Sequence, residues 1–364
     1  MKIGIDVSQA IFGTGVSDYT INLVHGLIRV DPSNSYVLFG SSLRRSADIK
    51  AIFPTARTFN LPPTFLHLLW NYLHAVNIET FIGPVDVFHS SDWVEPPSVA
   101  PKVTTVHDLS PFLYPDEMKS GLLRNISAVH AARMNWVLKE TAKIICVSQS
   151  TANELMDIFK VKPDRIAVIP EALPERFKIR PTEVEIAQVK KTYGLDDYVL
   201  AIGTPQPRKN ISKLVEAYLE YKDKLRLPEK LVIVGGHGWG ITDIPASDSV
   251  IFTGFLPTNQ TAALLAGCQV FAYPSLHEGF GLPILNAFYQ QVPVVTSNCS
   301  SMPEVAGEAA VLVDPKSSEQ IAHGLALAIK NRDKFVKLGH KQLTKFSWDK
   351  AAKDTLMIYD QICS

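Results

Sequence analysis

Short apolar runs that alternate with helical patterns are the feature that most constrains the fold of this chain. The alternation begins at Lys2–Val7, which is followed by a glycine turn and a helical pattern over Tyr19–Val30. Such alternation predicts an α/β fold with a mostly parallel sheet, because each parallel connection needs a crossover segment. The further strands predicted in this first set are Tyr36–Gly40, Val85–His89, Lys102–Asp108, Lys143–Val147 and Ile166–Pro170.

A charged stretch with little strand character, 171–197, separates this set from a second one. We interpret it as an interdomain connection with a short helical pattern at Glu183–Lys191. The strands predicted beyond it are Tyr198–Gly203, Lys230–Gly235, Val250–Thr253, Val270–Tyr273, Pro293–Thr296 and Ala310–Val313. A length of 364 residues also favours two domains.

The segment 346–364 has the pattern of an amphipathic helix, with Ser347 as its N-terminal cap. Such a helix must bury its apolar face against another part of the protein. The predicted organisation is therefore an N-terminal domain at 1–170, the connection at 171–197, a second domain at 198–345 and the closing helix at 346–364.

Composition excludes several classes of function. Basic and acidic residues number 36 each. The chain therefore lacks the excess of positive charge that would indicate a nucleic acid partner. The four cysteines are far apart in sequence, which argues against a zinc site or a disulfide framework and favours a reducing cytosol. Met1–Val7 does not have the pattern of a signal peptide, and no stretch approaches the roughly 18 apolar residues of a membrane span. We expect a cytoplasmic protein, soluble or peripheral to a membrane.

Glycine-rich nucleotide motifs of the common kinds are absent. The loop at Gly13 lacks the third glycine of a dinucleotide fingerprint, and Gly235–Gly240 has its glycines at the wrong offsets. The sequence contains neither a Walker A motif nor an Asp-x-Asp pair that would hold a divalent cation. If a diphosphate binds, we expect protein cations and helix N-termini to neutralise it without a metal.

The stretch Ser275–Phe288 predicts a loop that contains two glycines and then starts a helix. Amides at a helix N-terminus favour an anion, and glycines allow a ligand to approach the backbone. Glu278 at the mouth of this loop would repel phosphate, so its expected partner is a neutral, hydroxyl-rich group beside the phosphate. The combination predicts a phosphorylated sugar.

Arg208 and Lys209 follow a predicted strand and precede a predicted helix, which would place them at the carboxyl edge of the second sheet. Such a pair could simply be solvated. Positive charge is mildly unfavourable at a helix start, however, and this mismatch favours an anionic ligand.

Two features of the first domain have equally ordinary explanations. His107 and Asp108 end a predicted strand, where they could bind a ligand or only cap the next turn. Gly13–Asp18 could be a phosphate loop or an ordinary turn between a strand and a helix.

The motif Glu278-Gly-Phe-Gly-Leu-Pro283, together with Arg208-Lys209-Asn210 and Thr253–Pro257, resembles the retaining glycosyltransferases of family four. The likeness extends over nearly the full length, including Gly13–Gly15 and the closing helix. It implies the GT-B fold: two Rossmann-like domains that face each other across a cleft, with a C-terminal helix that crosses back to the first domain.

The resemblance also implies roles for individual residues. Arg208 and Lys209 would bind the donor diphosphate, Glu278 would bind the hydroxyls of the donor sugar, and His107 would approach that sugar. The remaining donor contacts implied are Gly13 and Gly15 at the phosphates, Phe255 near the base, and the amides of Gly279, Phe280, Gly281 and Leu282.

One position departs from the family pattern. The second glutamate of the motif, which usually binds the ribose hydroxyls, is Asn286 here. An amide can donate to and accept from a hydroxyl, but it lacks the charge that strengthens the bond. We expect donor binding to survive with a more weakly held ribose.

The resemblance implies metal-independent transfer of a hexose with retention, by attack on the same face of the sugar. UDP-glucose is the donor expected first, with GDP-mannose as the alternative. The acceptor would be a glycan or lipid-linked glycan at the inner face of a bacterial membrane. Leu61–Leu73 is apolar and aromatic, and could be an acceptor-facing or lipid-facing surface or a core helix.

Two rival functions also fit the sequence. The missing glutamate would also suit a binding module that recognises a nucleotide sugar without transferring it. A GT-B epimerase or phosphorylase is the other rival, although no pyridoxal-binding lysine region of the phosphorylase type is identified.

Overall fold

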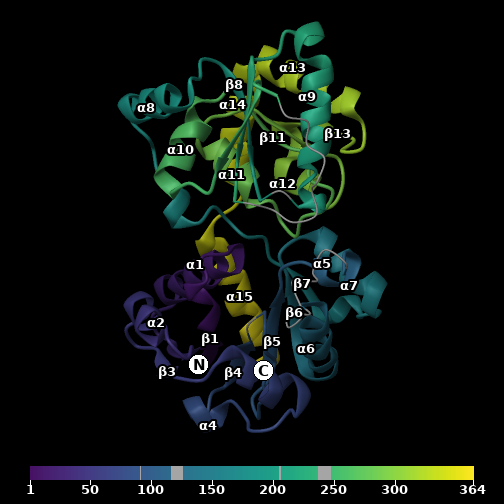
Figure 1. Ribbon diagram of the computed structural model, residues 1–364. Helices are drawn as coiled ribbons and strands as arrows, with labels where there is room; N and C mark the ends of the chain where they lie inside the picture. The colour runs from purple at the N-terminus through teal and green to yellow at the C-terminus, as the bar shows by residue number, and fades with distance from the viewer. Residues whose placement is uncertain (91, 116–125, 205, 237–246) are drawn as a thin grey trace. The chain divides into compact units, whose positions relative to one another are not determined.

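The computed structural model describes residues 1–90, 92–115, 126–204, 206–236 and 247–364, which form two compact units (Figure 1). The first unit comprises Met1–Ala172 and Ser347–Ser364, and the second comprises Leu173–Phe346. The α/β prediction with two Rossmann-like domains is confirmed. The sequence also predicts a helix over Leu122–Thr141, and the start of that range lies outside the described residues, as does most of the glycine-rich stretch 235–240.

The first unit contains a seven-stranded parallel sheet with the order β3-β2-β1-β4-β5-β6-β7. Its strands are β1 (Lys2–Asp6), β2 (Ser35–Ser41), β3 (Arg57–Phe59), β4 (Val87–Ser90), β5 (Lys102–Val106), β6 (Thr141–Cys146) and β7 (Ile166–Val168). The strand order reverses between β1 and β4. In open parallel sheets, ligands bind outside the carboxyl ends of the strands at such a point.

Helices lie between most of these strands, although none separates β4 from β5 among the described residues. They are α1 (Gly15–Val30), α2 (Ser46–Ile52), α3 (Pro63–Leu66), α4 (Glu79–Ile82), α5 (Ser110–Leu113), α6 (Ile126–Glu140) and α7 (Gln149–Phe159), with the short helical turns η1 (Ser8–Ile11), η2 (His67–Tyr72) and η3 (Pro163–Arg165). Helix α1 begins with a capping box, in which Thr14 and Ser17 each bond the other's backbone amide.

The C-terminal helix α15 (Trp348–Cys363) belongs to the first unit and packs along α1. Figure 1 shows this helix in yellow. Gly26 permits the close approach, because a Cβ atom there would lie 3.1 Å from the carbonyl oxygen of Trp348. The cap predicted at Ser347 is confirmed: its hydroxyl accepts a hydrogen bond from the amide of Lys350 at 3.1 Å.

The second unit contains a six-stranded parallel sheet with the order β10-β9-β8-β11-β12-β13. Its strands are β8 (Tyr198–Ile202), β9 (Lys230–Val234), β10 (Val250–Gly254), β11 (Val270–Tyr273), β12 (Val294–Ser297) and β13 (Ala310–Val313). Here the order reverses between β8 and β11. The loops that follow these two strands carry Arg208, Lys209 and Glu278.

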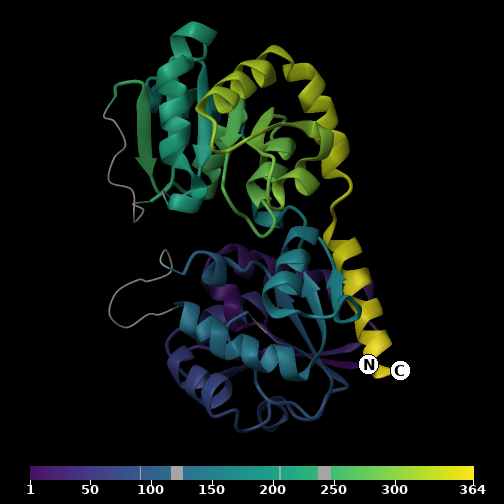
Figure 2. The same cartoon turned by 90° about the vertical axis from the view of Figure 1, so that its right-hand side faces the viewer.

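The helices of the second unit flank this sheet (Figure 2). They are α8 (Glu183–Tyr193), α9 (Ile211–Leu225), α10 (Thr258–Gly267), α11 (Leu282–Tyr289), α12 (Met302–Ala306), α13 (Ser318–Lys330) and α14 (Arg332–Leu343), with the turns η4 (Glu175–Phe177), η5 (Pro207–Lys209) and η6 (Gly307–Ala309). Most of the stretch expected as a connection, from Leu173 to Asp197, belongs to this unit, where α8 packs on α10.

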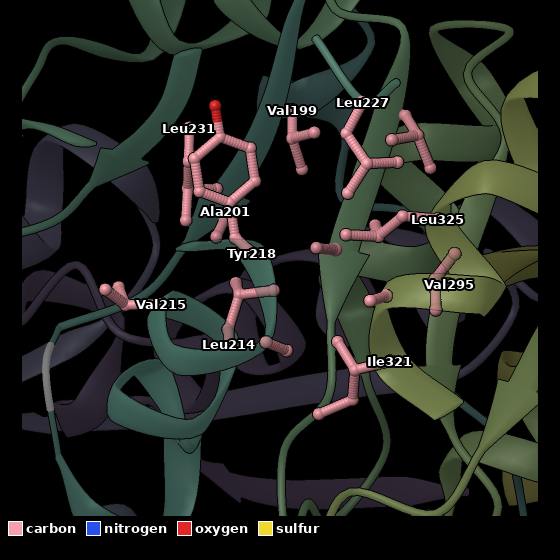
Figure 3. Packing of buried hydrophobic residues seen from close by; sticks show 14 of the residues in the cluster. Val199, Ala201, Leu214, Val215, Tyr218, Leu227, Leu231, Val295, Ile321 and Leu325 are labelled. Atoms are coloured by element: carbon pink, nitrogen blue, oxygen red, sulfur yellow. The ribbon is translucent and has the colours of Figure 1, made fainter. Parts of the chain in front are cut away.

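Apolar side chains of α9 and α13 form the largest part of a core against the strands of the second sheet. Figure 3 shows Leu214 and Tyr218 of α9 and Leu325 of α13 beside Val199 of β8 and Val295 of β12. Burial of this area is the main source of the unit's stability. This core supports the sheet whose carboxyl edge carries the loops with Arg208, Lys209 and Glu278.

The apolar segment Leu61–Leu73 is partly core and partly surface. Trp70 is fully buried and donates a hydrogen bond from its indole nitrogen to the carbonyl of Val76. Phe65, Leu68 and Tyr72 are exposed on the same segment. Among the described residues, no helix combines the length and apolar character that a membrane crossing requires.

Candidate active site

Arg208 and Lys209 lie in η5, between the end of β8 and the start of α9. Asn210 ends this turn with a left-handed backbone (φ 58°) and donates from its side chain to the carbonyl oxygens of Pro274 and Pro315. The amide of Leu276 donates to the carbonyl oxygen of Arg208 at 2.7 Å. These bonds attach the cationic turn to the loops that follow β11 and β13.

Glu278 brings the two cations together. Its Oε1 lies 2.6 Å from Nζ of Lys209, and its Oε2 lies 3.3 Å from Nη1 of Arg208. Nζ of Lys209 also donates to the hydroxyl of Tyr273 at 3.0 Å. The three charged residues singled out in the sequence of this domain therefore form one cluster at the switch point of the second sheet.

The charge on Glu278 is strongly stabilised. Burial alone would raise the pKa of this carboxyl, but the charges of Lys209 and Arg208 and hydrogen bonds from Lys209 and Tyr273 lower it to about 2. Burial, followed by the charge of Glu278, raises the pKa of the Tyr273 hydroxyl well above its ordinary value. The cluster thus holds an ionised carboxylate beside a neutral phenol at neutral pH.

Two serines after β12 hold the Glu278 loop in place. The Ser300 hydroxyl accepts from the Glu278 amide at 3.1 Å and donates to the Glu278 carbonyl oxygen at 2.7 Å. The Ser301 hydroxyl lies within bonding distance of the carbonyl oxygens of Glu278 and Phe280. Sequence reasoning missed Tyr273, Ser300 and Ser301, since a tyrosine in a strand and serines in a turn carry no distinctive pattern.

The glycine loop continues into α11. Gly281 caps this helix with φ 108°, a conformation that favours glycine. The Phe280 ring is buried and packs edge-on against Phe346, 5.7 Å between centroids. The first amides of α11 have no acceptors within the helix, which is the general basis of anion binding at helix N-termini.

Asn286 lies one turn into α11 and is only 8% exposed. Its Oδ1 is buried and has no hydrogen-bond partner within the described part of the chain. A buried amide oxygen without a partner is costly, so the position is suited to a ligand that donates a hydrogen bond. Phe255, the residue expected near the base, follows β10 and is 84% exposed.

His107 follows β5 in the first unit. Its Nδ1 lies 3.0 Å from Oε1 of Glu171, and the ring of Tyr19 meets it edge-on at 4.6 Å. Asp108 caps the next turn, because its Oδ1 accepts from the amide of Ser110 at 2.9 Å. The two candidates left open in the sequence therefore differ: Asp108 serves the turn, whereas His107 has a carboxylate partner 64 residues away in the sequence.

Gly13 and Gly15 flank the capping residue Thr14 at the start of α1. Gly13 has φ 70° and open space around the position of a Cβ atom, whereas Gly15 is the first residue of the helix. An ordinary turn between strand and helix is enough to explain the conformation of Gly13. A role of this loop in ligand binding is a proposal.

Comparison with known proteins identifies the family. The model described as glycosyl transferases group 1 matches residues 183–343, and that described as glycosyltransferase family 4 matches residues 13–174. The O-antigen chain mannosyltransferase B of Escherichia coli is 30% identical over 286 residues, which cover 75% of this chain and 74% of that protein.

Two further matches differ in what they cover. The serotype-specific mannosyltransferase WbdA of Escherichia coli is 32% identical over 228 residues, 57% of this chain but 27% of that protein, so the match spans about a quarter of its length. The structure of sucrose-phosphate synthase from Thermosynechococcus elongatus shares the GT-B fold. It has a TM-score of 0.72 at 17% identity, and the match covers 100% of this chain and 99% of the synthase chain.

The chain belongs to the family 4 glycosyltransferases, described as glycosyl transferases group 1.

Proposed function

We propose that this glycosyltransferase moves a mannose from GDP-mannose to a growing surface polysaccharide, with retention of the anomeric configuration. The observation that carries the proposal is the contact of Glu278 with both Arg208 and Lys209. Cations suit a diphosphate, and the carboxylate suits the hydroxyls of a sugar attached to it. Mannose is favoured over the glucose expected from sequence because both relatives reported above are mannosyltransferases, one of them an O-antigen chain mannosyltransferase.

Each candidate residue has a role in this proposal. Arg208 and Lys209 bind the diphosphate together with amides at the start of α11, and Glu278 binds the sugar hydroxyls. Asn286 accepts a hydrogen bond from the ribose, for which its unpaired Oδ1 is suited. The remaining donor contacts proposed are Gly13, Gly15, His107 and Phe255.

The proposed chemistry is attack on the same face of the sugar. The acceptor hydroxyl forms the new glycosidic bond as the bond to the diphosphate breaks, and the leaving diphosphate oxygen takes up the acceptor proton. Arg208, Lys209 and the helix-end amides stabilise the charge that develops on the leaving group. The two side-chain cations supply the charge that a divalent metal would otherwise supply, so we propose a metal-independent reaction.

We also propose that the acceptor is a lipid-linked glycan and that the protein attaches weakly to the membrane that carries it. The exposed side chains of Phe65, Leu68 and Tyr72 are consistent with such attachment. Co-sedimentation with vesicles of bacterial lipids tests this part separately from the transfer reaction.

A donor panel tests the function. GDP-mannose, UDP-glucose and ADP-glucose should be compared in thermal-shift and transfer assays, each with and without EDTA. We expect stabilisation and turnover with GDP-mannose, unchanged by EDTA. Glu278→Ala should abolish transfer while nucleoside diphosphate binding remains. Full activity of this variant would refute the assignment of Glu278, and binding of a donor without any turnover would favour a binding module.

A further inference from the structure

Arg208 and Lys209, the cations proposed to bind the donor diphosphate, have an anionic partner within the protein itself. Glu278 contacts Lys209 at 2.6 Å and Arg208 at 3.3 Å. The side chains of all three residues are at most 17% exposed. Attraction between charges is much stronger in such a setting than in bulk water. A phosphate group that enters the site must therefore compete with Glu278 for both cations.

The carboxylate has little freedom to leave the cluster. The backbone of Glu278 is bonded on both sides to Ser300, and Ser301 bonds its carbonyl oxygen as well. Tyr273 is hydrogen-bonded to the carboxylate and to Nζ of Lys209. The pKa of about 2 means that the competing charge persists throughout the physiological range.

The competition affects substrate and product differently. When the diphosphate binds Arg208 and Lys209, Glu278 loses its contacts with these cations. The hydroxyl groups of a donor sugar can donate hydrogen bonds to the carboxylate and so replace the lost contacts. A free nucleoside diphosphate offers no such hydroxyls at this point. Its terminal phosphate also carries an additional ionisable oxygen, so it places more like charge beside the carboxylate.

We propose that Glu278 is an internal counter-anion for Arg208 and Lys209, through which the site favours the nucleotide sugar over the free nucleoside diphosphate product. The inference rests on the proposed function, because it assumes that these cations bind the donor diphosphate. It adds a second task to Glu278: besides holding the sugar, the carboxylate weakens the binding of the spent nucleotide.

Isothermal titration calorimetry with GDP, UDP and inorganic pyrophosphate tests the inference in the intact chain. Glu278→Gln keeps the shape of the side chain and removes its charge. We expect this variant to bind GDP and pyrophosphate at least tenfold more tightly than the wild type, which corresponds to about 1.4 kcal/mol. Its affinity for GDP-mannose should fall or stay constant, so the preference for the sugar nucleotide is lost.

Glu216→Gln is the matched control. Glu216 also pairs with a lysine of the same unit, Lys213 at 2.8 Å, but it belongs to α9 rather than to the cluster. This variant should bind every ligand as the wild type does. If Glu278→Gln does not fold, Glu278→Asp replaces it, since the shorter side chain retracts the charge from both cations and should give an intermediate gain in GDP affinity.

The outcomes separate the two proposals. Unchanged or weaker GDP and pyrophosphate binding by Glu278→Gln overturns the counter-anion, even when transfer is lost as the proposed function requires. Wild-type transfer by this variant overturns the role of Glu278 in the proposed function. An equal gain in the Glu216→Gln control would show that general electrostatics, rather than the cluster, explain the effect.

Discussion

Nδ1 of His107 lies 3.0 Å from Oε1 of Glu171, and both side chains are largely buried. Burial by itself lowers the pKa of His107, but the hydrogen bond to Glu171 and the charges of Glu171, Asp92 and Asp108 raise it above its ordinary value of 6.5. Because Nδ1 is engaged by the carboxylate, the orientation of the ring is fixed. Glu171 therefore determines both the charge and the direction of the histidine that we expect at the donor sugar.

Glu171→Gln should lower the pKa of His107, since the amide keeps the shape but removes the largest favourable charge. The raised pKa stabilises the folded protein fully below pH 6.5, and this contribution is lost as pH rises through the folded-state pKa. The free energy of unfolding of the variant should therefore fall by about 2 kcal/mol below pH 6.5, with a smaller loss at higher pH. NMR titration of His107 and urea unfolding at several pH values check this.

Tyr273→Phe should impair transfer without unfolding the protein. The substitution removes the hydroxyl that contacts Lys209 at 3.0 Å, so the ammonium and the Glu278 carboxylate are less well positioned. We expect kcat/KM to fall about tenfold. Tyr198→Phe is the control, because the Tyr198 hydroxyl donates to the carbonyl of Leu264, away from the cluster. A similar loss of activity in both variants would argue against a positioning role for Tyr273.

Asn286→Glu should tighten nucleotide binding. The Asn286 Oδ1 has no partner within the described residues, and a carboxylate at this position would bind the ribose hydroxyls by charge-assisted bonds. We expect about a fivefold gain in GDP affinity, together with a lower melting temperature of the ligand-free protein because a buried charge would lack a partner. Calorimetry and thermal unfolding measure the two effects. Unchanged nucleotide affinity would refute our account of this position.

The sequence predicted the parallel sheets because their strands are apolar runs between helices. It missed β3, Arg57–Phe59, which has only three residues and no apolar run of its own. It also assigned the α8 helical pattern to a connection, because the charged surface of α8 hides its packing on α10. Pattern reasoning locates elements well, but it does not show to which unit a charged helix attaches.

The candidate site was predictable where its residues belong to a motif. Arg208, Lys209 and Glu278 were expected to share a site, and they do. Glu171 was not expected beside His107, because no motif links the two residues and the contact depends on how the chain leaves β7. The partners that fix charge and orientation come from tertiary packing, which single-sequence patterns do not encode.

The Glu278 cluster should also make the second unit sensitive to acid. The pKa of this carboxyl falls from an ordinary value of 4.5 to about 2 in the folded protein, since the charges of Lys209 and Arg208 outweigh the cost of burial. A lowered folded-state pKa stabilises the protein above the unfolded-state pKa, and the contribution is lost as pH falls through the folded-state value.

Glu278→Gln should therefore reduce the free energy of unfolding by about 3 kcal/mol between pH 5 and 7, and the difference from the wild type should shrink as pH falls from about 4.5 to 2. Urea unfolding across this range measures the difference. Tryptophan fluorescence follows mainly the first unit, which holds four of the five tryptophans (Trp70, Trp93, Trp136 and Trp348), and far-ultraviolet circular dichroism follows the whole chain. The fluorescence transition should change less than the total signal, because Glu278 belongs to the second unit. A difference that stays constant down to pH 2 would mean that the ion pairs with Arg208 and Lys209 do not stabilise the fold.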